Sequence, residues 1–150
     1  GLPYAFASHF APGEMMRALD VYRQTFRPSA HLAEPYAMLG YNVFAAETDQ
    51  AARLLFSSVQ QAFVNLRTGR PGKLPAPVEG YYESLDGAAR GMIDAALACS
   101  AVGSPETVRA TMDAFIAKTG ADELMVTSQI WDPGARVRSL ELLAGAVGGV

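Results

Sequence analysis

The residues best suited to chemistry are Ser8 and His9, a polar pair that ends an apolar run from Leu2 to Ala7. This run is too short to cross a membrane, and it predicts a strand buried on both faces, as in parallel sheets. Active sites of folds in which strands alternate with helices lie at such strand ends. His9 is the best titratable candidate, because an imidazole can move a proton near neutral pH. A purely structural histidine is the alternative.

The other histidine and the single cysteine do not indicate a metal site. His31 lies in a connector between Pro28 and Pro35, and neither histidine has ligand spacing with Cys99 or with a cluster of acidic residues. Cys99 lies in an apolar run that we interpret as helical, so we expect a buried thiol rather than a nucleophile. A lone cysteine cannot form an internal disulfide, which favours a reducing compartment.

Polar residues also follow the two later apolar runs. Glu47 and Thr48 could face a pocket, but capping of the next helix explains them fully, with Thr48 as N-cap. After the third run we expect Asp132 to cap a helix, with Arg136 ion-paired near it; a phosphate held by Arg136 is the alternative. The segment 102–105 is too short to be a dinucleotide-binding fingerprint.

Three strands, each followed by a helix, must position these residues. We expect strands over 2–7, 36–46 and 123–131. We expect helices over 16–26, 52–66 and 88–99, another from its N-cap Ser104 to Gly120, and a last one after Asp132. Between them, the Pro-rich segment 70–84 predicts an exposed loop, with an active-site lid or partner surface as the alternative.

This alternation predicts an α/β fold with three parallel strands and flanking helices. An eight-stranded (β/α) barrel needs about 250 residues, so a chain of 150 residues with three strands cannot close one. The opening of the chain inside a strand favours the C-terminal portion of a TIM-type barrel. A small free-standing α/β sandwich is the alternative.

Composition favours small-molecule chemistry. Half of the residues are hydrophobic and 18% are charged, which is enough to build a core. A net charge of −3 gives no electrostatic footprint for nucleic acid, and no basic amphipathic stretch indicates a membrane surface. We therefore expect a cytoplasmic protein with neither nucleic-acid nor membrane partners.

Five motifs in register along the whole chain resemble the bacterial luciferase-like flavin-dependent monooxygenases. They are Gly1 to Pro12, Tyr22-Arg23 with Phe26-Arg27-Pro28-Ser29, Ala45 to Thr48, Val102 to Glu106, and Gly120 to Val126. The resemblance implies that residues 1–150 are one partial barrel domain containing about the sixth to eighth strands. It also implies reduced FMN, oxygen and a small organic substrate, with a flavin reductase as a partner and an oligomeric enzyme; relatives on the same fold use the deazaflavin F420 instead.

The resemblance also implies roles for the first strand end. There the family's strand touches the flavin ring, so Ala7 and Ser8 match cofactor-binding positions, and His9 is the catalytic candidate, able to hydrogen-bond a flavin or shuttle a proton. Small residues such as Ala5 and Ala7 can leave room for a planar cofactor, although close packing against a helix would also require them. Some family members carry other residues in place of His9.

Two other classes of function stay open. The chain could be a non-catalytic half-barrel that associates through its open strand edges, or an unrelated α/β binding domain whose loop 70–84 holds a ligand. Because a barrel site draws on several strand ends, we expect the isolated chain to bind FMN poorly and to lack oxygenase activity.

Overall fold

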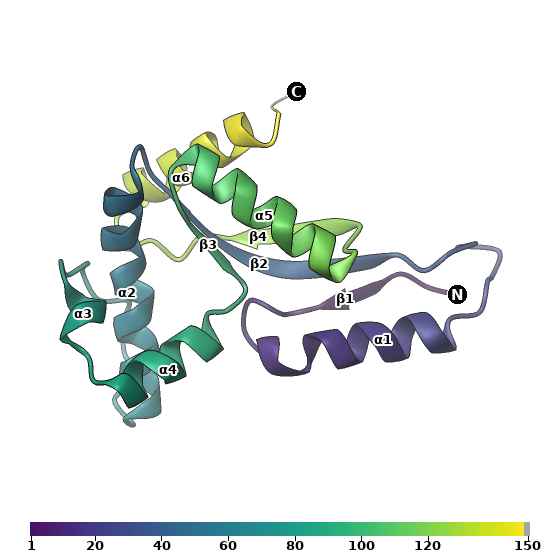
Figure 1. The fold of residues 1–150 in the computed structure, drawn as a ribbon, viewed down its shortest axis with the longest axis horizontal. Coiled ribbons are helices and arrows are strands. Elements are labelled where there is room, and N and C mark those ends of the chain that lie inside the picture. The colour runs from purple at the N-terminus through teal and green to yellow at the C-terminus, as the bar shows by residue number, and fades with distance from the viewer. Residues whose placement is uncertain (149–150) are drawn as a thin grey trace.

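The longest strand, β2, is the centre of a four-stranded parallel sheet (Figure 1). The computed structural model describes residues 1–148. The strands are β1 (Tyr4–Phe6), β2 (Ala37–Ala45), β3 (Ser100–Gly103) and β4 (Glu123–Thr127). β1 pairs with residues 37–39 of β2 and β3 with residues 42–45, while β4 pairs with residues 38–42. In a strand, every second residue directs its amide and carbonyl groups to the same edge. Even-numbered residues of β2 and the residue before it bond to β1 and to the residue before β3, whereas the odd-numbered Ala37 bonds to the residue before β4. β1 and β3 therefore lie end to end on one edge of β2, and β4 lies on the other edge.

Helices separate the strands in the order that the periodicity predicted. They are the 3-10 turn η1 (Pro12–Glu14) and the α-helices α1 (Met15–Thr25), α2 (Asp49–Arg67), α3 (Tyr81–Ser84), α4 (Gly87–Ala96), α5 (Pro105–Thr119) and α6 (Pro133–Ala146). The predicted N-caps Thr48, Ser104 and Asp132 are confirmed, because each side chain accepts a hydrogen bond from the amide three residues on. Gly120 ends α5 in the left-handed conformation, with φ of 61°.

One face of the sheet is packed against helices. Odd-numbered residues of β2, among them Leu39, Tyr41 and Val43, are at most 2% exposed and lie against α1, α5 and α6. A second cluster lies at the carboxyl end of β2, where Phe44 packs against α2 and α4. Figure 1 shows α2, α3 and α4 gathered at the end of the molecule where β2 ends. Phe44 belongs to the opposite face of the sheet, and the rest of that face lies outside both clusters.

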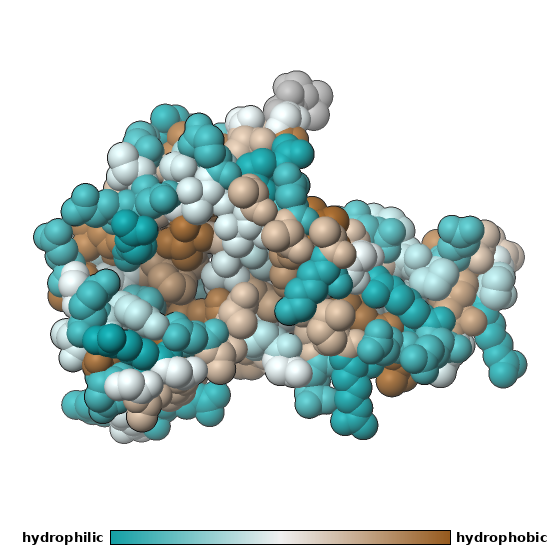
Figure 2. Space-filling model, viewed as in Figure 1, coloured by the Kyte–Doolittle hydropathy of each residue, from teal (hydrophilic) through white to brown (hydrophobic). Residues whose placement is uncertain are grey.

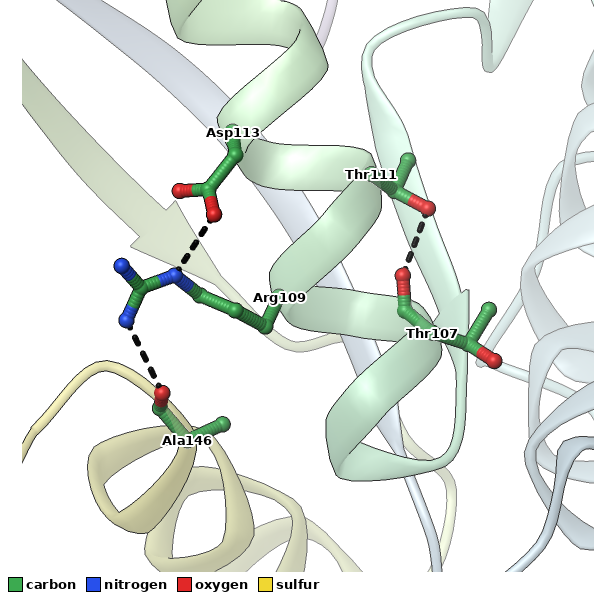
Figure 3. A network of polar contacts seen from close by, with 5 residues as sticks. All are labelled: Thr107, Arg109, Thr111, Asp113 and Ala146. Carbon is green, nitrogen blue, oxygen red and sulfur yellow. Dashed lines mark hydrogen bonds and ion pairs between the residues drawn. The ribbon is translucent and has the colours of Figure 1, made fainter.

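Side chains of α5 fix the end of α6. Arg109 of α5 pairs with Asp113 at 2.8 Å, and its Nη1 donates to the carbonyl of Ala146 at 3.1 Å (Figure 3). A cation at a helix C-terminus satisfies a free carbonyl and opposes the negative end of the helix dipole. This contact holds α5 and α6 together on the packed face.

The first strand is shorter and less buried than predicted. β1 covers only residues 4–6, and the expectation of burial on both faces is wrong: Tyr4 and Phe6 are half-buried toward the helices, whereas Ala5 is exposed. The physical reason is that α1 covers one side of β1 and nothing in the described chain covers the other.

A fourth strand was not predicted. β3 follows α4, which ends at Ala96, so the helical run predicted over 88–99 is too long and Cys99 lies outside the helix, directly before β3. Cys99 is buried as expected, at 3% exposure, and burial raises the pKa of its thiol. β3 escapes a periodicity argument because four residues are too few to show alternation.

Two further boundaries differ from the predictions. The segment 70–84 is not wholly a loop, because the left-handed Gly80 (φ of 66°) starts the short helix α3. β4 ends at Thr127 rather than near residue 131, since the Ser128 hydroxyl, instead of a further backbone amide, donates to the Val43 carbonyl of β2 at 2.9 Å.

Candidate functional site

The face of the sheet opposite the main helix layer forms a shallow, partly polar surface. The register of the four strands aligns its residues in three rows, namely Ala5, Met38 and Glu123; then Gly40 and Met125; then Ser100, Asn42 and Thr127. The first two rows combine small and flexible side chains, and Ala5, Ala7 and Met125 are exposed. We call this surface the open face.

Asn42 is the centre of the polar row on the open face. Its Nδ2 donates to the His9 carbonyl at 3.2 Å and to Ser100 Oγ at 3.3 Å, and its Oδ1 accepts from Thr127 Oγ1 at 2.8 Å. Asn42 is only 2% exposed, so each of these bonds is made in a desolvated environment. The side chain thereby ties β3, β4 and the segment after β1 to the middle of β2.

His9 lies over β2 at its only glycine. A Cβ on residue 40 would overlap Nδ1 of His9, so Gly40 is required for this close approach. Nδ1 is sealed from solvent and has no hydrogen-bond partner among residues 1–148. A buried ring nitrogen without a partner is uncommon, and here Nδ1 faces the backbone of Gly40.

Ser8 is buried in the turn after β1, whereas Ala7 is exposed. Ser8 is fully buried, and its hydroxyl donates to the Gly40 carbonyl at 2.6 Å, which fixes the turn after β1. Ala7 is exposed, and its carbonyl accepts from the amides of Phe10 and Ala11 within that turn. The structure therefore brings Ser8 and His9 together on Gly40 and leaves the methyl group of Ala7 accessible.

Among the candidates after β2 and β4, Glu47 and Asp132 have structural partners, whereas Arg136 does not form its expected ion pair. Arg138, not Arg136, forms the ion pair, at 2.9 Å from Glu47, and this contact lowers the pKa of the Glu47 carboxyl. The expected pairing of Arg136 near Asp132 is wrong: Arg136 is exposed and has no ion pair among residues 1–148. Because the Asp132 carboxylate already accepts the Ala135 amide at 2.7 Å, the start of α6 is a poor place for a phosphate.

The junction between β3 and α5 is bound to the start of α2. Asp49 Oδ1 accepts a hydrogen bond from the Ser104 amide at 2.7 Å, and this bond holds the pKa of the Asp49 carboxyl below its usual value. A side chain at Gly103 would meet Asp49 Oδ1 at 2.6 Å, so a glycine is needed there. The motif at 102–106 is thus explained by packing.

A cavity of about 770 Å³ opens beside α2. Its walls come from α2, from residues 78–83 and from the end of β3; they include Leu54, Phe56, Gln60, Val78, Tyr82 and Val102. In Figure 2, apolar side chains gather in a hollow on the left of the molecule, where Figure 1 places α2 and α3. The cavity is the right size for a small organic ligand.

Sequence reasoning missed Asn42, Gly40 and the cavity. Asn42 and Gly40 interrupt an otherwise apolar strand at alternate positions, and this interruption was the available signal that one face of β2 differs from the other. The cavity had only an indirect signal, the Pro-rich segment 70–84 with its alternative as a lid or ligand-holding loop, because residues 78–83 form one of the cavity walls. Among residues 1–148, no three His, Cys, Asp or Glu side chains are grouped to hold a metal ion, and no described helix is long and apolar enough to cross a membrane.

The chain is similar to known monooxygenases in sequence and to solved structures in fold. The chain is 45% identical over 142 residues to a luciferase-like monooxygenase of Escherichia coli strain K12, which covers 95% of the chain and 42% of that protein. It superposes on the crystal structure of apo-MsnO8 with a TM-score of 0.78 and 29% identity, over 100% of the chain and 46% of the other. No family model matches the chain.

A third relative supports the fold alone. The oxygenating constituent of 3,6-diketocamphane monooxygenase of Pseudomonas putida, a type II Baeyer-Villiger monooxygenase in complex with FMN, superposes with a TM-score of 0.56 at 20% identity, over 99% of the chain and 42% of that protein. The chain thus spans less than half the length of the proteins it matches. The predicted fold class, part of a TIM-type barrel with parallel strands and flanking helices, is confirmed.

Proposed function

Since the chain is homologous along nearly its whole length to luciferase-like monooxygenases, we propose that it supplies part of the barrel of a flavin-dependent monooxygenase. In this proposal the complete enzyme uses reduced FMN and oxygen to oxygenate a small organic substrate, with a reductase supplying the reduced flavin in the cytoplasm. The observation that carries the proposal is 45% identity over 95% of the chain to a protein of that name.

The open face has features that suit a planar cofactor. Ala5 and Ala7 present no large side chain, and the half-buried imidazole of His9 lies over Gly40 on this face. FMN, when bound and reduced, supplies the electrons and the oxygen chemistry. Barrel interiors are normally filled by large aliphatic residues, so the small residues Ala5 and Ala7 support a cofactor site.

The proposed roles of this chain's residues follow from their positions. Ala7 would leave space for the flavin ring, and the imidazole of His9 would hold or move a proton beside it. Ser8 acts as a positioning residue, because its bond to the Gly40 carbonyl sets the turn that carries His9. Asn42 acts in the same way, through the His9 carbonyl.

The test compares the complete enzyme with the 150-residue chain. We expect the complete enzyme to bind FMN and, with a reductase and oxygen, to oxygenate an organic substrate. FMN at about 100 times its dissociation constant should stabilise it by about 2.7 kcal/mol. The chain alone should bind FMN poorly, since the other strand ends of a barrel site are not part of it. Absence of any thermal shift in the complete enzyme, with FMN and with F420 in parallel, would contradict the proposal.

A further inference from the structure

The cavity beside α2 is built from this chain alone, and it is mostly apolar. Leu54 and Phe56 of α2 face Val78 and the end of β3 across it. The loop that carries Val78 is tied to α2 by side-chain bonds, because the Val78 amide donates to Ser57 Oγ at 2.8 Å and Gln61 Nε2 donates to the Ala76 carbonyl at 2.9 Å. The cavity is therefore a formed part of the fold.

One side-chain amide in this wall is open to the cavity. Gln60 lines the cavity and is only 6% exposed, and among residues 1–148 its side chain makes no hydrogen bond with another group. A donor and an acceptor are thus both available at the cavity surface.

The charges around the cavity disfavour an anion. Glu79, Glu83 and Asp94 line it, against the single cation Arg53. Tyr82 already donates to Asp94 at 2.8 Å and 3.0 Å, and this bond raises the pKa of the tyrosine. A phosphate or carboxylate entering the cavity would meet net negative charge, so an uncharged ligand fits better.

One lining residue of the cavity lies on the side of β3 that belongs to the open face. Val102 lines it and lies two residues from Ser100, on the same face of β3, and Ser100 accepts the hydrogen bond from Asn42. Two residues of a strand span about 7 Å. A molecule that contacts Val102 would thus lie about 7 Å along β3 from the polar row.

We propose that this cavity binds the organic substrate, an uncharged molecule with an apolar body and one polar group that hydrogen-bonds the Gln60 amide, and that it excludes the flavin. Identifying the ligand as the substrate rests on the proposed function; the cavity and its selectivity do not. Gln60 is then a specificity-determining residue, because it selects the polar group while Leu54, Phe56 and Val78 contact the apolar body.

The experiment uses Prodan, an uncharged naphthalene ketone whose fluorescence reports an apolar environment, titrated into the 150-residue chain. Gln60→Leu should weaken Prodan binding about tenfold, because the ketone loses its partner in a buried site. Ala51→Phe, which fills the cavity from α2, should weaken it at least as much. Gln24→Leu, a matched change on the exposed side of α1, should leave it unchanged. FMN should not displace Prodan.

Circular dichroism shows whether each variant keeps the fold. If folded Gln60→Leu and Ala51→Phe chains bind Prodan as the unchanged chain does, or if equimolar FMN displaces it, the proposal is wrong. No flavin or turnover enters the Prodan titrations of the variants. A complete enzyme without oxygenase activity would therefore overturn the proposed function and leave the cavity assignment in place.

Discussion

The close approach of His9 to Gly40 makes a sharp prediction about Gly40→Ala. A methyl group at residue 40 would overlap the imidazole, so the ring must move or the strand must shift. Overpacking of this kind costs about 1 to 3 kcal/mol. Alanine would otherwise be the better residue, since glycine inside a strand costs about 0.5 to 1 kcal/mol relative to alanine.

The test is a double-mutant cycle measured by urea unfolding. We expect Gly40→Ala alone to destabilise the protein by about 1 to 3 kcal/mol, which lowers Tm by about 2 to 4 °C per kcal/mol in a chain of this size. In the His9→Ala background the overlap is gone, so the same substitution should be neutral or stabilising. His9→Ala itself should cost less than Gly40→Ala, because the imidazole removed has an unpartnered nitrogen.

The coupling free energy between residues 9 and 40 decides whether the imidazole lies on Gly40. Residues in direct contact couple by about 0.5 to 3 kcal/mol, whereas independent sites add to within about 0.5 kcal/mol. If Gly40→Ala costs the same with and without the imidazole, the ring does not lie on Gly40, and the geometry assigned to the end of β1 is refuted.

Two further predictions concern buried polar side chains of β2. Asn42→Ala should lower the free energy of unfolding by about 1 to 3 kcal/mol, because His9, Ser100 and Thr127 all lose a hydrogen-bond partner. Ser100→Ala removes only one of these bonds and should cost less. Equal losses for the two variants in urea unfolding would count against the network. Burial raises the pKa of Tyr41 from 10.0 to about 12, so the unfolded chain loses this proton first and stability should fall as pH rises from 10 to 12. Tyr41→Phe should reduce that alkaline loss, and a variant with an unchanged pH profile would show that Tyr41 does not titrate as described.

Elements governed by local chemistry were predictable from the sequence. Thr48, Ser104 and Asp132 each cap a helix, and a long apolar run became β2, because caps and hydrophobic periodicity act within a few residues. β3 was not predicted, because its four residues form a strand only by hydrogen-bonding to the carboxyl end of β2, which is distant in sequence.

The candidate site was predictable at one strand end and no further. Ser8 and His9 follow an apolar run, which is a local signal, but their contact with Gly40 depends on the pairing of β1 with β2. The network at Asn42 joins residues up to 85 positions apart, and the ion pair of Glu47 with Arg138 spans 91. Spacing along the chain carries no information about such contacts.

The most direct test of the central claim, that the open face of the sheet holds the flavin, is the FMN dissociation constant of the complete enzyme carrying Ala7→Trp. Ala7 is exposed, lies outside the core and directly follows β1 beside that face, so an indole there should block a planar cofactor without unfolding the protein. We expect FMN binding to weaken at least tenfold, while Ala110→Trp, at an exposed position of α5 on the opposite side of the sheet, leaves it unchanged. Unchanged FMN affinity in a folded Ala7→Trp enzyme would contradict the claim.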